Sequence, residues 1–142
     1  MIEEYDTAII GGGISGFTSA LRLQKKGFNT VVFEAHGQIG GCAGFFSKKG
    51  FSFDVGATAL VDFVEHGVGG NFFKEINLDL TQGEYIDYIA WLPDRHLTLY
   101  LNAIPQDIGV ENFWLAGDNT WPGLGTVAGL ISGRIAAEYA AK

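Results

Sequence analysis

A glycine-rich loop directly after a short apolar run limits the fold more than any other feature of this sequence. The stretch 5–16 reads YDTAIIGGGISG, in which "TAII" (7–10) predicts a short buried strand. Residues 14–27 carry apolar side chains at helical spacing and end in basic residues and a glycine, which predicts a helix. "NTVVFEA" (29–35) predicts a second buried strand. This order predicts a βαβ unit with parallel strands and a right-handed crossover.

The glycines of the loop have the spacing Gly-x-Gly-x-x-Gly, which in this context is the dinucleotide-binding fingerprint. Gly11 makes the tight turn, Gly13 lets a pyrophosphate lie against the backbone, and Gly16 lets the helix pack closely on the strand. Glu34 ends the next strand and is expected to accept hydrogen bonds from ribose hydroxyls. The alternative is a glycine-rich turn without a ligand, and the fingerprint does not separate FAD from NAD. The cofactor-binding residues predicted in this unit are Gly11, Gly13, Ile14, Ser15, Gly16, Glu34 and Ala35.

Composition excludes several other classes of function. The net charge is −7 and the nine basic residues are scattered, so nucleic acid is not an expected partner. Cys42 is the only cysteine and the three histidines have no ligand spacing, so neither a disulfide nor a metal site is predicted. The sequence contains no run of about 18 apolar residues, so it predicts no membrane-spanning helix. The default expectation is a cytoplasmic protein.

The rest of the chain predicts further elements around this unit. Residues 59–79 predict a helical region interrupted at 67–70 (GVGG), and residues 85–101 predict a β-hairpin around Pro-Asp-Arg. "NFWLA" (112–116) predicts another strand. The final segment, 125–142, predicts a helix whose glycines, four residues apart, form a stripe that allows close packing on a neighbouring helix.

Two longer stretches resemble the carotenoid desaturase and isomerase group, and more distantly the amine oxidases. They are "EAHGQIGGCAGFFSKKGFSFDVGAT" (34–58) and "GVENFWLAGDNTWPGLGTVAGLISGRIAA" (109–137). The resemblance implies an α/β, Rossmann-like (GR2-type) FAD-binding domain with a parallel sheet, helices on its faces and an added β-hairpin. It also implies FAD, rather than NAD, as the cofactor.

The resemblance carries site residues over to this chain. The Gly-Gly pair would approach the ribose and pyrophosphate, the Asp-x-Gly stretch would lie near the flavin, and Asp118 would bind the ribityl hydroxyls. The start of the last helix would face the pyrimidine edge of the flavin, where a helix N-terminus stabilises developing negative charge. Cys42 stands where relatives often have a basic or small polar residue. The residues implied in this way are Gly40, Gly41, Cys42, Asp54, Gly56, Gly117, Asp118, Gly125 and Thr126.

Members of this group are several times longer than 142 residues. Residues 1–142 are therefore expected to form a single minimal FAD-binding domain, in which a motif at 5–100 joins a motif at 108–140 near residues 101–105. The function expected from the resemblance is the core of a flavin-dependent oxidoreductase that has no specific substrate turnover by itself. The alternatives are a non-catalytic flavin-binding module and an oligomeric fold fragment without a tight ligand. No catalytic residue is assigned. The many aromatic residues predict self-association as a dimer, and membrane contact is undecided.

Overall fold

The computed structural model describes residues 3–56, 62–78, 103–117, 119–121 and 125–142. Strand β1 (Thr7–Ile10), helix α1 (Ile14–Lys25) and strand β2 (Thr30–Phe33) follow one another at the N-terminus. The two strands pair in parallel, with Thr7 opposite Thr30 and Ile10 opposite Phe33. The βαβ unit predicted from the sequence is therefore confirmed.

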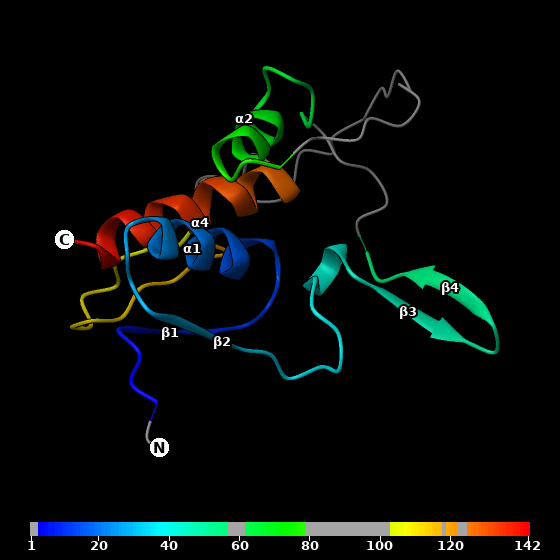
Figure 1. Cartoon of the computed structure of the whole chain (residues 1–142), viewed down its shortest axis with the longest axis horizontal. Coiled ribbons are helices and arrows are strands. Elements are labelled where there is room, and N and C mark those ends of the chain that lie inside the picture. The colour runs from blue at the N-terminus through cyan, green and yellow to red at the C-terminus, as the bar shows by residue number, and fades with distance from the viewer. Residues whose placement is uncertain (1–2, 57–61, 79–102, 118, 122–124) are drawn as a thin grey trace.

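Helix α4 (Thr126–Ala140) packs along α1, although more than a hundred residues separate them in the chain (Figure 1). Gly133 allows this, because a Cβ atom there would overlap the carbonyl oxygen of Ser15. At Gly129 a Cβ atom would lie 3.1 Å from Ser15 Oγ. The Ser19 hydroxyl donates to the Gly133 carbonyl oxygen at 2.9 Å, across the same interface. The predicted close approach of the last helix to a neighbour is confirmed.

The main core lies between these helices and a third one. Helix α2 (Val68–Glu75) lies against α4 and is joined to α1 by an ion pair between Arg22 and Glu75 (Figure 1). Phe72 of α2 is buried, and its ring meets that of Phe73 edge-on. Among the described residues, the buried apolar side chains are Leu23, Phe72, Ala128, Leu130, Ala136 and Ala137.

The predicted interruption of the second helical region at 67–70 is wrong, because α2 begins at Val68 and runs through both following glycines. A Cβ atom at Gly69 would overlap the ring of Phe63, and one at Gly70 would overlap the carbonyl oxygen of Val64. The glycines therefore let residues 62–66 fold back over the first turn of the helix. Asp62 also accepts a hydrogen bond from the Val68 amide at 2.8 Å.

An antiparallel hairpin is formed by β3 (Phe45–Lys48) and β4 (Phe51–Asp54), after the short 3₁₀ turn η1 (Gly41–Ala43). The hairpin projects away from the helices (Figure 1). The hairpin predicted over 85–101 lies outside the described residues.

Two strand predictions need correction. β1 and β2 have the expected positions, but neither is buried: Ile10 is 87% exposed and Phe33 58%. In the described part of the chain their sheet has only these two strands, so few neighbours cover them. Residues 112–116 form no strand, since only Trp114 makes a β-bridge there, with Asp107. Among the described residues, no helix combines the length and the apolar character needed to cross a bilayer.

Candidate dinucleotide site

The loop after β1 has the geometry that the fingerprint predicts. Gly11 has a φ of +103°, a conformation that favours glycine, and its amide donates to the Phe33 carbonyl oxygen at 2.7 Å. A Cβ atom at Gly16 would overlap the Gly11 carbonyl oxygen, so this glycine sets how closely α1 approaches the loop. A Cβ atom at Gly13 would meet only the Cα of Gly41, at 3.8 Å. The space where a side chain at position 13 would lie is therefore largely free.

The second glycine pair lies directly against this loop. Gly40 donates from its amide to the Gly12 carbonyl oxygen at 2.8 Å, and a Cβ atom at Gly41 would come within 3.1 Å of the Gly13 Cα. Both Gly40 (φ +123°) and Gly41 (φ +58°) have the left-handed backbone that favours glycine. Two glycine clusters 27 residues apart in the sequence thus meet backbone against backbone.

Glu34 joins the end of β2 to the loop. Its carboxylate accepts hydrogen bonds from the Gly12 amide at 2.6 Å and the His36 amide at 2.9 Å, and the His36 ring nitrogen lies 3.0 Å away. The His36 amide, followed by the Gly12 amide, lowers the pKa of Glu34 from 4.5 to about 2. The carboxylate is therefore ionised over the physiological range, and its first role is to hold the loop.

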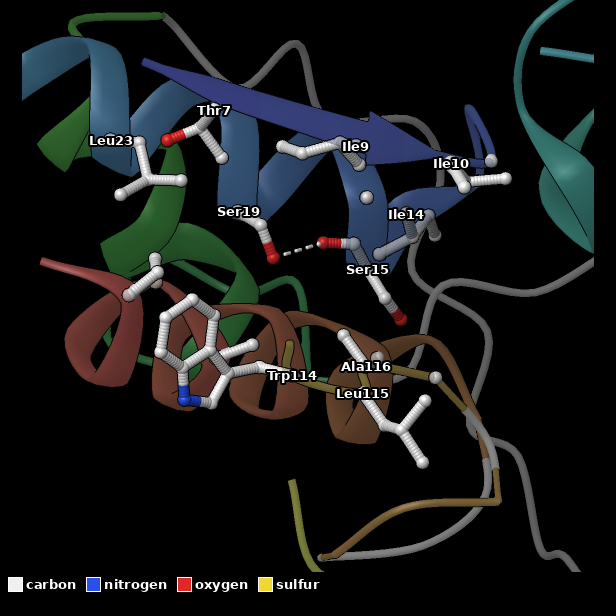
Figure 2. A pocket seen from close by; sticks show the side chains of 18 of the residues that line it. Thr7, Ile9, Ile10, Ile14, Ser15, Ser19, Leu23, Trp114, Leu115 and Ala116 are labelled. Atoms are coloured by element: carbon white, nitrogen blue, oxygen red, sulfur yellow. Dashed lines mark hydrogen bonds between the residues drawn. The ribbon is translucent and has the colours of Figure 1, made fainter. Parts of the chain in front are cut away.

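A cavity of about 920 Å³ lies beside the loop, within the usual size range of small-molecule sites. In Figure 2, Ile9 and Ile10 come from β1 on one side, and Trp114 and Leu115 come from the segment on the opposite side. The N-terminal ends of α1 and α4 both line it. Ten predicted site residues line it: Gly11, Gly13, Ile14, Ser15, Gly16, Gly40, Cys42, Gly117, Gly125 and Thr126.

Five other predicted residues do not line this cavity: Glu34, Ala35, Gly41, Asp54 and Gly56. Glu34 and Gly41 support the loop through the contacts described above. Gly56 stands behind the lining residue Cys42, since a Cβ atom there would lie 3.2 Å from the Cys42 carbonyl oxygen. Ala35 and Asp54 are exposed, Asp54 at the end of β4. Asp118 lies outside the described residues.

Two helix N-terminal ends contribute positive potential to the cavity. α1 begins after Gly13 and α4 after Gly125, and neither helix has a side-chain cap at that glycine or an acidic residue in its first turn. The first amide groups of a helix have no partner within the helix, and its dipole is positive at this end. The two ends together favour a negatively charged ligand. In the described part of the chain, no cluster of three His, Cys, Asp or Glu residues could hold a metal ion.

Residues not predicted from the sequence also shape the site. Trp114 lines the cavity, and the buried hydroxyls of Thr120 and Ser132 hold the Gly117 peptide beside it. In the sequence, Ser132 stands out only as a hydroxyl residue among the small residues of the last helix, and nothing there pairs it with Thr120.

Comparison with known proteins shows which proteins this chain is similar to. Residues 9–76 match the model of an NAD(P)-binding Rossmann-like domain. Prolycopene isomerase 2 from an Oncidium hybrid cultivar is 43% identical over 65 residues, covering 46% of this chain and 11% of the relative. A 4,4'-diapophytoene desaturase from Staphylococcus aureus is 37% identical over 106 residues, covering 71% and 20%. This chain is a homologue of the carotenoid desaturases and isomerases.

Two further matches have similar sequence identity to this chain. An all-trans-retinol 13,14-reductase from Rattus norvegicus is 33% identical over 91 residues, covering 64% of this chain and 14% of the relative. Among solved structures, an oxidoreductase from Methanosarcina mazei matches 50% of this chain and 17% of its own, at 37% identity and a TM-score of 0.45. This homologue of the desaturases thus spans between 11% and 20% of the length of the three curated relatives described here.

Proposed function

We propose that the cavity binds FAD, and that the chain is the FAD-binding core of an oxidoreductase resembling the carotenoid desaturases and isomerases. One observation carries this proposal: three stretches far apart in the sequence, around Gly13, Gly40 and Gly125, line the same cavity. Two of them are uncapped helix N-terminal ends, which suit a ligand with a pyrophosphate and an electron-accepting ring.

Each part of the cavity lining has its own task in this proposal. The amides at the start of α1 hold the pyrophosphate, and Gly13 leaves room for it. Glu34 uses three of its roughly four lone-pair positions on the loop and His36, which leaves capacity for a ribose hydroxyl. Gly125 and Thr126 face the flavin, and Asp118 binds the ribityl chain. Bound FAD supplies redox chemistry, while the chain orients the cofactor and limits its contact with water.

Ligand identification tests this proposal most simply. We expect mass spectrometry of the purified protein to find FAD rather than NAD. We also expect FAD, added to the apoprotein, to quench the fluorescence of Trp114, which lines the cavity. Trp114→Phe should remove most of this quenching, and Trp121→Phe, at a residue that is 53% exposed, should retain it. Tighter binding of NAD than of FAD would contradict the choice of cofactor.

A non-catalytic flavin-binding module is the second candidate. Among the described residues that line the cavity, the only ionisable side chains are those of Asp6 and Cys42, so no histidine or lysine stands ready as a general base. Formation of product from a polyene, together with bleaching of the flavin absorbance, would favour the enzyme. Bleaching by a chemical reductant without turnover of any polyene would favour the module.

We propose in addition that the chain self-associates, with a dimer as the expected state. The hairpin supports this, because Phe45, Phe46, Phe51 and Phe53 are each between 47% and 68% exposed. Exposed apolar clusters of this kind are unusual on monomers. Light scattering at micromolar concentration should give twice the monomer mass, and a purely monomeric mass would contradict the expectation.

A further inference from the structure

A closed ring of hydrogen bonds holds the Gly117 peptide between two buried hydroxyl groups. The Gly117 amide donates to Ser132 Oγ at 3.0 Å, and Thr120 Oγ1 donates to the Gly117 carbonyl oxygen at 2.7 Å. The two hydroxyls are bonded to each other. Ser132 is 0% exposed and Thr120 4%, so solvent does not compete for these groups.

The direction of every bond in the ring is fixed. An amide can only donate and a carbonyl oxygen can only accept, so the Thr120 proton is committed to the Gly117 carbonyl oxygen. The bond between the hydroxyls must then use the Ser132 proton, with Thr120 Oγ1 as the acceptor. Each hydroxyl donates once and accepts once, which is the arrangement in which buried hydrogen bonds reinforce one another.

The Gly117 carbonyl oxygen also accepts a hydrogen bond from the Thr120 amide at 3.1 Å, and the ring adds to this backbone contact. Gly117 has a φ of +143° and no side chain, and it lines the cavity. Ser132 stands on α4, whose N-terminal end, at Gly125 and Thr126, lines the same cavity. The ring therefore fixes the wall at Gly117 relative to the start of α4.

We infer that Thr120 and Ser132 are positioning residues for the flavin half of the site. They hold the Gly117 peptide in the conformation that the bound cofactor requires. This inference rests on the proposed binding of FAD. It assigns the two hydroxyls to the wall at Gly117 and the start of α4, whereas the proposed pyrophosphate contacts are the first amides of α1.

A matched pair of variants tests the inference. Thr120→Val keeps the shape of the side chain and removes its hydroxyl, whereas Thr120→Ser keeps the hydroxyl. We expect Thr120→Val to raise the Kd for FAD about tenfold and to leave the Kd for ADP unchanged, because ADP lacks the flavin half. Thr120→Ser should leave both within about twofold of the wild-type values. Ser132→Ala should reproduce the effect of Thr120→Val, and thermal unfolding shows whether each variant is folded.

Hydrogen exchange in the apoprotein tests the hydrogen-bonded ring independently of FAD binding. We expect the Gly117 amide to exchange at least about tenfold faster in Thr120→Val and Ser132→Ala than in the wild type, with no change in Thr120→Ser. Unchanged exchange in both hydroxyl-free variants would overturn the ring. Equal weakening of FAD and ADP would overturn the positioning role, since general destabilisation acts on both ligands. If the variants differ from the wild type in exchange as expected but the wild type binds no FAD, the proposed function itself is overturned.

Discussion

The helical half of the molecule and the β3–β4 hairpin both contain apolar residues, but the helices bury theirs and the hairpin exposes its own. α1 and α4 bury small side chains and glycines at a close interface, with Ala137 1% exposed and Leu23 2%. Every residue of β3 and β4 is exposed, including four phenylalanines, and Phe46 and Phe53 stack mainly on each other, with ring centroids 5.3 Å apart. Apolar content alone does not make a core: a second surface of matching shape is also needed.

The largest expected loss of stability comes from a substitution at the interface between α1 and α4. Gly133→Ala places a Cβ atom on the Ser15 carbonyl oxygen, where only backbone movement could relieve the overlap. We expect a loss of about 3 kcal/mol in the free energy of unfolding, measured by urea denaturation.

Gly129→Ala is the matched control for that substitution. Its Cβ atom would meet the Ser15 hydroxyl at 3.1 Å, a side-chain atom that can move, and alanine favours the helix. Its cost should stay below about 1 kcal/mol. Equal losses for the two variants would contradict the close α1–α4 interface.

The second prediction concerns pH and the loop that Glu34 holds. The pKa of Glu34 is lowered to about 2 in the folded protein, so its stabilising contribution is complete above the ordinary value of 4.5 and is lost as the pH falls toward 2. Glu34→Gln should therefore unfold at a lower temperature than the wild type at pH 7, and the difference should disappear near pH 2. Thermal unfolding followed by circular dichroism at several pH values measures this.

Glu111→Gln, at an exposed position, provides the control for Glu34→Gln and should match the wild type throughout. A difference between Glu34→Gln and the wild type that stays constant from pH 7 to pH 2 would contradict the assigned role of the carboxylate.

The smallest expected effect is in the hairpin. Phe46→Ser and Phe53→Ser remove side chains that are each 47% exposed, and should change the free energy of unfolding by about 0.5 kcal/mol or less at protein concentrations where the chain is monomeric. The same variants should lower the fraction of dimer at higher concentration. A loss of several kcal/mol in the monomer would show that the hairpin belongs to the core and would remove the contrast between the two regions.

The helical side of this comparison could be predicted from local sequence patterns, whereas the β3–β4 hairpin was not predicted. The glycine spacing and the apolar run before it predict β1, α1 and β2, and the glycine stripe of 125–133 predicts the close helix packing. These features depend on residues near one another in the chain or on one helix face. Ten of the sixteen predicted site residues line the cavity. Five of these follow from the glycine fingerprint and the helix start beside it, and five from the resemblance to the carotenoid desaturase and isomerase group.

The features that were missed depend on the tertiary environment. Whether β1 is buried depends on how many strands adjoin it, and whether residues 112–116 form a strand depends on a partner at the right distance. The ring of Gly117, Thr120 and Ser132 joins a loop to the middle of a helix, and no local pattern places those hydroxyls together. The glycines at 69 and 70 resemble a helix break in the sequence, but they accommodate the Phe63 ring and the Val64 carbonyl oxygen, a contact that no local pattern reveals.

Binding of FAD to Gly13→Ala tests the central claim most directly. The new Cβ atom meets only the Gly41 Cα, at 3.8 Å, and Gly13 has a φ of −81°, so the fold should accept alanine while the space for the pyrophosphate is reduced. We predict an unchanged unfolding temperature and a Kd for FAD at least about tenfold higher than that of the wild type, with Gly37→Ala, at a loop position with open space around it, binding normally. FAD bound equally well by Gly13→Ala and the wild type, or by neither, would contradict the claim.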